Sequence, residues 1–297
     1  RNKMKKQLLI AAVAASMTSV AMADVSISGN YKATVTAQAD AATTTVQDLD
    51  MKIVAKGTAG TATLVLDGGN GASSDNNAFG TVSQLSMSTT ILGLNAKMGD
   101  WKGTSGAHGL LNHSGLSTGK VELSTTVAGV SVAAATTSTN KNASVTLAGN
   151  VAGFDVKVQN ATDSSRMISL SGDIAGVSVA MERTKQTGGT NTAYSISGST
   201  SGLDITYAAA KINATAAGTN QADDNIFGNI DALKGGEKAT ALQVKTATAF
   251  GPATVKFAKV NGVKTNSVSV TNANVTYKYA KTTDAKAKLS AKVTFKF

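Results

Sequence analysis

The chain has 297 residues, of which 42% are hydrophobic, and it carries a formal net charge of +10. It contains no cysteine, which excludes a disulfide framework and thiolate metal sites. The chain has only two histidines, and no further metal ligands lie at fixed spacing from them. It also lacks the Gly-x-Ser-x-Gly nucleophile-elbow motif, so we expect no enzymatic activity, no metal and no cofactor.

Residues 4–23 have the parts of a secretory signal peptide. Lys5 and Lys6 supply the positive start, and Leu8–Ala15 form a short apolar stretch. A membrane-spanning helix needs about 20 mostly apolar residues, so this stretch is too short to be an anchor. We therefore expect residues 4–23 to be removed on export.

The end of this segment predicts the cleavage point. Ala21 and Ala23 fit the small-x-small pattern that signal peptidases recognise, which makes Asp24 the first mature residue. Residues 1–3 precede a natural start methionine and are interpreted as upstream, non-native sequence. Residues 24–297 show no change in composition or sequence pattern that would mark a domain boundary, so they are expected to form one domain.

The mature chain stays basic. The first 23 residues carry four of the 28 basic residues and none of the 18 acidic ones, so a net charge of +6 remains. Such a balance can indicate nucleic acid, an anionic membrane surface or anionic solutes as partners. The lysines are spread singly, with few aromatic residues between them, and exported proteins rarely meet nucleic acid, so we expect no nucleic-acid partner.

The mature sequence repeats one unit, an alternating apolar–polar segment followed by a short turn with glycine. A period of two predicts β-strands with one apolar and one polar face, and glycine supplies the positive φ of tight hairpin turns. The seven turns are Thr58-Ala59-Gly60, Leu92-Gly93-Leu94, Ala128-Gly129-Val130, Ala152-Gly153-Phe154, Ala175-Gly176-Val177, Ser201-Gly202-Leu203 and Phe250-Gly251-Pro252. Longer polar connections separate the hairpins, at about 68–80, 102–117, 184–191 and 211–237.

These features together predict the fold class. Residues 286–297 alternate without a break and end on Phe297. Short turns at one end and longer loops at the other are typical of bacterial outer-membrane barrels, whose short turns are periplasmic. We predict an all-β, transmembrane antiparallel β-barrel. The seven turns, a first strand at Val25–Ala37 and the last strand give sixteen strands, but residues 264–280 hold at least one further strand-like segment, so eighteen stays open.

This pattern resembles the Gram-negative general porins over the whole mature chain, most clearly at its first strand (DVSISGNYKATVTAQ) and at its last. Tyr277-Lys278-Tyr279 and the Lys/Thr turn after them are similar to porin carboxyl ends. The resemblance implies a homotrimer of sixteen-stranded barrels in the outer membrane of a Gram-negative bacterium, in contact with lipid and lipopolysaccharide. It implies a water-filled channel for passive diffusion of small hydrophilic solutes, and it implies that Phe295 and Phe297 form the signal read by the barrel-assembly machinery.

The resemblance also implies that the loop after the fifth strand narrows the pore. Counting from Val25, the fifth strand is Leu94–Trp101, so Lys102–Thr118 is the candidate constriction loop. Its charged or titratable residues are Lys102, His108 and His113. Porin eyelets usually carry an arginine cluster, whereas the mature chain has only two arginines, so lysine would have to supply that field.

If the apolar residues face lipid, their neighbours face the lumen. Eleven lysines are then expected to line the pore: Lys32, Lys52, Lys97, Lys120, Lys157, Lys245, Lys256, Lys278, Lys288, Lys292 and Lys296. Five acids share that face, namely Asp67, Glu122, Asp155, Glu182 and Asp204. The positive surplus predicts a modest preference for small anions such as chloride, phosphate or carboxylates. The alternative is that many of these lysines pair with acids or lipid phosphates and set no selectivity.

Two other classes stay open. A secreted adhesin or β-solenoid without channel activity can have the same Ala-, Thr-, Val-, Asn- and Gly-rich composition, although the sequence shows no strict repeat period. An outer-membrane barrel enzyme would need a catalytic signature, which the sequence lacks.

Overall fold

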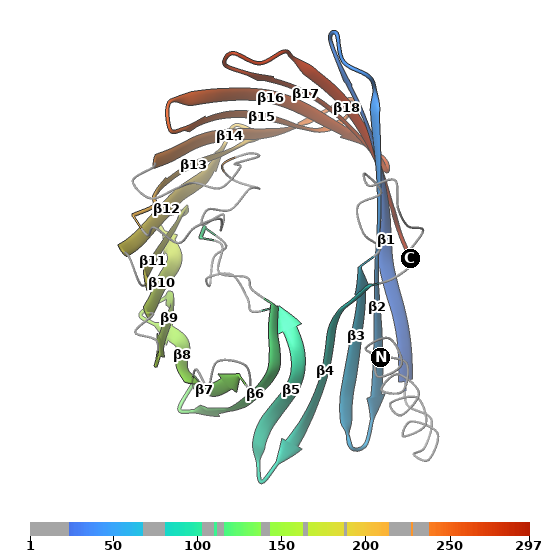
Figure 1. Cartoon of the computed structure of the whole chain (residues 1–297). Helices are drawn as coiled ribbons and strands as arrows, with labels where there is room; N and C mark the ends of the chain where they lie inside the picture. The colour runs from blue at the N-terminus through green and yellow to red at the C-terminus, as the bar shows by residue number, and fades with distance from the viewer. Residues whose placement is uncertain are drawn as a thin grey trace.

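The computed structural model describes residues 24–67, 81–102, 110–111, 116–137, 143–162, 166–186, 189–213, 227 and 238–297. In this part the chain forms eighteen β-strands arranged as one ring (Figure 1). The strands are β1 (Asp24–Gln38), β2 (Thr44–Gly57), β3 (Gly60–Asp67), β4 (Thr81–Ile91), β5 (Leu94–Lys102), β6 (Leu116–Val127), β7 (Val130–Thr137), β8 (Ala143–Val151), β9 (Phe154–Ala161), β10 (Arg166–Ile174), β11 (Val177–Gln186), β12 (Gly189–Thr200), β13 (Leu203–Lys211), β14 (Lys238–Thr248), β15 (Gly251–Val260), β16 (Val263–Asn272), β17 (Val275–Thr282) and β18 (Lys288–Lys296).

The ring closes between its first and last strands. Every strand pairs antiparallel with its neighbours in the chain, and β18 pairs with β1 from Asn30 opposite Lys296 to Gln38 opposite Lys288. Closure gives each of the eighteen strands two partners, so backbone N–H and C=O groups are satisfied within the sheet, as crossing a lipid bilayer requires. Among the residues described, no helix is long and apolar enough to cross a membrane. The predicted antiparallel barrel is confirmed.

The strand number is eighteen, so the count of sixteen obtained from glycine turns is wrong and the alternative is correct. The missed hairpin joins β16 to β17 through Ala273 and Asn274, with no glycine. Ala273 itself takes a φ of 49°, as Ala128, Ala152 and Ala175 do at the first position of their turns. A glycine search therefore overlooked this turn, and residues 264–280 were left without a partner in the count.

Short turns occupy one end of the barrel. Eight hairpins there turn through two residues each, at 58–59, 92–93, 128–129, 152–153, 175–176, 201–202, 249–250 and 273–274. β1 begins and β18 ends at this same end, which we call the turn end. The opposite end has connections of very different lengths, from 187–188 to 212–237. The predicted long connection at 184–191 is wrong, because β11 continues to Gln186 and β12 starts at Gly189.

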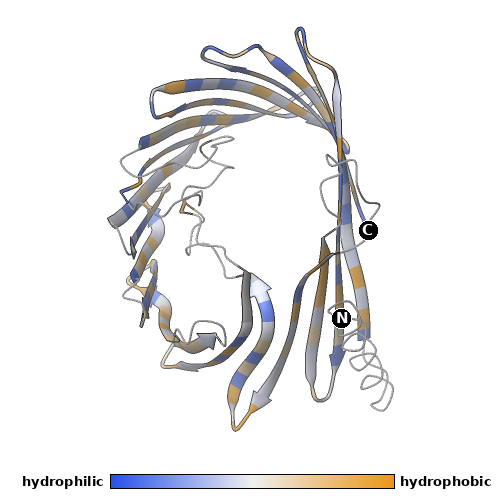
Figure 2. Cartoon of the chain, viewed as in Figure 1, coloured by the Kyte–Doolittle hydropathy of each residue, from blue (hydrophilic) through white to orange (hydrophobic). Residues whose placement is uncertain are grey.

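Each strand has an outward apolar row and an inward row. On β13 the exposed Leu203 and Tyr207 alternate with Ala208 and Ala210, which are buried in a cluster inside the ring. Figure 2 shows the same alternation of hydrophobic and hydrophilic bands along the strands. More than thirty large apolar side chains are exposed, far more than water tolerates on a soluble protein, so the outward face requires a lipid solvent.

The seam between β1 and β18 is held at its end by Phe297. Gly29 donates its N–H to the Phe297 carbonyl at 2.8 Å, and the Phe297 N–H donates back to the Gly29 carbonyl at 3.1 Å. A Cβ at position 29 would lie 2.6 Å from the Phe297 ring and 2.4 Å from the carbonyl oxygen of Asp50. Glycine at this position therefore leaves room for the Phe297 ring beside the Asp50 carbonyl.

We predict that Gly29→Ala destabilises the barrel, because the added methyl group overlaps both the Phe297 ring and a backbone oxygen. Overpacking of this kind costs about 1–3 kcal/mol. The measurement is the temperature at which the compact band on an unboiled SDS gel converts to the unfolded band. Gly198→Ala is the control, since the nearest atom to its added Cβ lies at 3.9 Å. Equal conversion temperatures for the two variants would contradict the seam's tight packing.

Candidate functional site: the barrel interior

The interior holds chain that is not part of the wall. Leu110 and Leu111, from the β5–β6 connection, are 1% and 0% exposed, and in Figure 1 the short coloured piece at 110–111 lies inside the ring of strands. They belong to one buried cluster with Phe227, from the β13–β14 connection, and with Ile212. Two connections from the end of the barrel opposite the turn end thus meet inside the barrel.

The wall beneath this cluster is made of alanine. The buried alanines are Ala193 on β12, Ala208 and Ala210 on β13, Ala239 and Ala241 on β14, and Ala258 on β15. Their side chains are short, so leucine and phenylalanine can lie close to the sheet and exclude water. We call this surface the alanine cradle. It is a dry patch on a wall whose other inward positions are largely polar.

A charged side chain fixes the inner segment to the wall. The Leu111 N–H donates to Glu182 Oε2 at 2.7 Å, and Glu182 on β11 is 0% exposed. A carboxylate acceptor makes this bond stronger than one between neutral groups. Next to it, the buried Asn191 on β12 accepts from the Asn213 N–H at 3.0 Å. The two inward connections are therefore tied to neighbouring strands of the same wall.

Across the interior, lysines surround the one tryptophan in the chain. The Nζ atoms of Lys97 and Lys120 each lie 4.6 Å from the centre of the Trp101 ring. Lys120 also lies 3.4 Å from Glu122, and Lys52 adds like-charge repulsion on Lys97. Three ammonium groups share one carboxylate on β2, β5 and β6, so this region keeps a positive surplus that attracts anions.

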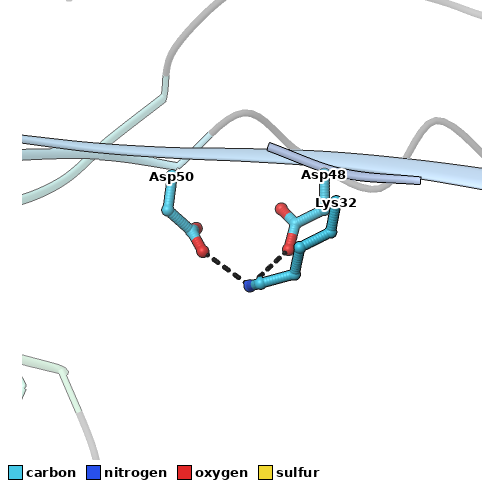
Figure 3. A network of polar contacts seen from close by, with 3 residues as sticks. All are labelled: Lys32, Asp48 and Asp50. Atoms are coloured by element: carbon cyan, nitrogen blue, oxygen red, sulfur yellow. Dashed lines mark hydrogen bonds and ion pairs between the residues drawn. The ribbon is translucent and has the colours of Figure 1, made fainter. Parts of the chain in front are cut away.

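Lys32 is neutralised by two acids. Its Nζ lies 2.8 Å from Asp50 Oδ2 and 3.1 Å from Asp48 Oδ2, and Figure 3 shows the three side chains on one side of the β1–β2 ribbon. The group as a whole is negative by one charge. Neither aspartate was among the five acids inferred from the sequence, although both alternate with the apolar Leu49 and Met51 and could have been found by the same rule.

The strand registers place all eleven expected lysines in rows that alternate with outward apolar residues. Lys245 lies opposite Asp204, whereas the lysines of β15, β17 and β18 lie opposite uncharged residues. These five are Lys256, Lys278, Lys288, Lys292 and Lys296. We call the inward face of β15–β18 the lysine arc.

Acids gather elsewhere on the interior, near the turn end of β8–β13. Asp155 accepts from Asn150 at 3.0 Å, Asp204 accepts from Ser199 at 2.5 Å, and Asp173 accepts from Ser178. Asp173 was another acid missed from the sequence. The interior is thus divided between a lysine arc and a wall that carries carboxylates.

Several predicted residues fall outside this description. Ala21, Ala23, His108 and His113 are not among the described residues, and only the backbone of Lys102 is described, at the end of β5. Within the described part, no group of three or more His, Asp or Glu residues could hold a metal ion.

No protein-family model matches the sequence, and no curated protein matches it. Solved structures do. A triple mutant of Rh. blastica porin matches with a TM-score of 0.57, 10% identity and coverage of 92% of this chain and 100% of that one. This chain has a porin-type fold. A double variant of OccD1 (OprD) also matches, with a TM-score of 0.57, 10% identity and coverage of 94% and 97%.

Pseudomonas aeruginosa OccK2 (OpdF) gives a TM-score of 0.56 at 11% identity, with coverage of 93% of this chain and 97% of that one. Because coverage is nearly complete on both sides, the similarity concerns the whole barrel rather than a shared hairpin. Identity this low concerns the fold alone. The porin-type fold therefore comes from shared alternation and closure, and what the interior does must be argued from this chain's own residues.

We predict that Glu182→Ala widens the path through the barrel. Without its acceptor the buried Leu111 N–H loses a charge-assisted bond, and an unsatisfied buried donor costs about 1–3 kcal/mol, so the inner segment leaves the wall more often. The measurement is the single-channel conductance in a planar bilayer, together with the noise of the open-channel current. Asp204→Ala is the control, since it removes an inward carboxylate that does not hold this segment. Currents of wild-type size and noise in Glu182→Ala would contradict the role of this bond.

Proposed function

We propose that this chain forms a water-filled channel for passive diffusion of small hydrophilic solutes across the outer membrane of a Gram-negative bacterium. The observation that carries the proposal is the sorting of side chains on a closed sheet, apolar outward and mostly polar or charged inward. Lipid outside and water inside are the solvents that match those two faces. The alternative of a secreted or surface adhesin or β-solenoid without channel activity is not favoured, because the sheet closes on itself.

The packing of Leu110 and Leu111 on the alanine cradle supports a narrowed lumen. A segment held inside the barrel reduces the cross-section open to solutes, so we propose that the β5–β6 connection is a constriction loop. Phe227 belongs to the same cluster, which supports a second contribution from the β13–β14 connection. Such a channel would pass small solutes and exclude large ones by size.

We propose a modest preference for small anions such as chloride, phosphate or carboxylates. The lysine arc supports this, because Lys278, Lys288, Lys292 and Lys296 lie opposite uncharged residues. The positive surplus around Trp101 supports it as well. A low-dielectric pore focuses such a field and raises the local anion concentration. The neutralised Lys32 and the carboxylates near the turn end act against it, which is why the preference is modest.

Further proposals concern export and assembly. Residues 4–23 are proposed as a signal peptide cleaved after Ala23. Phe295 and Phe297 are proposed as the signal read by the barrel-assembly machinery; both are about half exposed on the outward row of the final strand. A homotrimer is proposed on the porin-type fold and on the outward face of β18 and β1–β9, where Asp100 on β5 is the one charged residue among the side chains that the structure describes, so subunits could pack there while burying little charge.

The test is the current carried by residues 24–297, refolded into a planar bilayer across a KCl gradient. We expect stepwise currents and a reversal potential whose sign shows that chloride crosses more readily than potassium. Replacing Lys278, Lys292 and Lys296 by Gln should reduce the chloride-to-potassium permeability ratio roughly twofold or more. The matched control replaces three lysines of the outward rows, Lys259, Lys264 and Lys281, by Gln and should leave the ratio unchanged.

Two results would contradict the proposal at different levels. A silent bilayer, with the protein shown to be folded by its compact band on an unboiled gel, would exclude the channel. An equal chloride-to-potassium permeability ratio in the wild type and in the variant with Lys278, Lys292 and Lys296 replaced by Gln would contradict the anion preference. The proposal that the chain forms a channel would still stand.

A further inference from the structure

A buried carboxylate lies at the edge of the alanine cradle. Glu182 on β11 lies directly opposite Ala193 on β12, and the same row continues through Ala210 on β13 and Ala239 on β14. All four side chains are at most 6% exposed. Residues directly opposite one another in an antiparallel pair share one face of the sheet, with Cβ atoms about 4.5–5.5 Å apart. The wall therefore places a negative charge at the border of a dry apolar surface.

Two hydroxyl groups beside Glu182 have no hydrogen-bond partner in the described part of the chain. Ser169 on β10 lies directly opposite Glu182, and Thr184 lies two residues along β11 on the same inward face. Their side chains are 0% and 3% exposed, and neither Ser169 Oγ nor Thr184 Oγ1 is bonded to another described residue. A buried polar group that is left unsatisfied lowers the stability of a fold. These hydroxyls indicate a place where hydrogen bonds are available to a ligand.

The inner segment of the chain occupies this place with an imperfect match. Leu111 donates a neutral backbone N–H to Glu182 Oε2 at 2.7 Å, and the Leu110 and Leu111 side chains are buried in the same cluster as the alanines. This N–H is a single donor, so it leaves both hydroxyls without a bond and brings no positive charge to the carboxylate. A primary ammonium group has three N–H donors and a full charge. Its hydrogen bond to a carboxylate is roughly twice as strong as a bond between neutral groups.

The neighbours of Glu182 determine the direction in which a bound cation extends. Lys157 on β9 lies two strands away in the same row, on the side opposite the cradle, where it repels a cation. On the cradle side the neighbours are uncharged, with Ala193 opposite Glu182 and the buried Asn191 opposite Thr184. An ammonium group at Glu182 therefore directs the rest of its molecule onto the alanines.

We propose that Glu182, Ser169, Thr184 and the alanine cradle form a binding site for a small solute that carries a primary ammonium group next to an apolar side chain. The ammonium group takes the place of the Leu111 N–H, and the apolar side chain takes the place of the Leu111 side chain on the cradle. The inner segment is then a built-in competitor that the solute displaces. Binding does not depend on conduction, whereas the widening of the channel that displacement causes rests on the proposed function.

The test is a calorimetric titration of the folded mature chain, in neutral detergent at about pH 7, with leucinamide, which has one ammonium group and one isobutyl side chain. We expect saturable binding. Two matched probes should bind at least about tenfold more weakly, namely glycinamide, which lacks the side chain, and isocaproamide, which lacks the ammonium group. Amide hydrogen exchange of peptides that contain Leu111 should become faster when leucinamide is bound, because this N–H loses its acceptor.

Variants of the site separate recognition of the charge from loss of the fold. Glu182→Gln should weaken leucinamide binding at least about tenfold, since its amide oxygen still accepts from the Leu111 N–H but carries no charge. Replacing Ser169 by Ala and Thr184 by Val together should weaken binding roughly threefold or more and leave the barrel at least as stable, because the lost hydroxyls have no partner when the ligand is absent. Asp204→Asn, which neutralises an inward carboxylate near the turn end, is the control and should bind like the wild type. The compact band on an unboiled gel shows that each variant is folded.

The proposal is overturned if the folded chain shows no saturable binding of leucinamide, if either matched probe binds as tightly, or if Glu182→Gln binds like the wild type. Displacement of leucinamide by sodium, calcium or ammonium chloride at the same concentration would also overturn it, since it would show a site for the bare cation. A silent bilayer has no bearing on these results. The failure of this proposal is therefore separate from the failure of the channel.

Discussion

The pairing of β1 with β18 is the constraint on which the rest of the structure depends. A sheet placed in lipid cannot leave an edge with unpaired N–H and C=O groups, so the last strand must return to pair with the first. The pairing of Gly29 with Phe297 completes that return at the last residue. Once the sheet is closed, each strand has one face toward lipid and one toward the interior, and the period of two along the sequence follows from that division.

The interior uses its wall in two different ways. On β12–β15 small alanines replace the polar residues expected of a wet wall, and two inward connections pack there through Leu110, Leu111 and Phe227. On β15–β18 the inward rows instead hold lysines opposite uncharged neighbours. One wall thus positions the segment that narrows the path, and the adjoining wall supplies the charge that a passing solute meets. On the outer surface, the basic side chains that the structure describes in the outward strand rows lie on β10–β17, at the end opposite the turn end.

Much of the fold was predictable from the sequence because lipid and water impose a strict alternation. The terminal strand and the seven glycine hairpins follow from it, whereas the inner connection after β5 was expected only from the resemblance to the general porins. The turn at Ala273-Asn274 was missed because a non-glycine residue adopts positive φ there, which composition does not reveal. The alanine cradle was missed because alanine fits both faces of an alternating strand. Neutralisation of Lys32 depends on the register between β1 and β2, which places two acids within reach of one ammonium group.

The most direct test of the account is the accessibility of β18, residue by residue, in lipid vesicles. The natural chain has no cysteine, so single cysteines from position 289 to 296 can be labelled without background by a water-soluble, membrane-impermeant maleimide. A closed barrel with a wet interior predicts that alternate positions react. The reactive set should be Ser290, Lys292, Thr294 and Lys296, and the protected set Leu289, Ala291, Val293 and Phe295. Uniform reactivity along the strand, or uniform protection, would contradict the division into a lipid face and a water face.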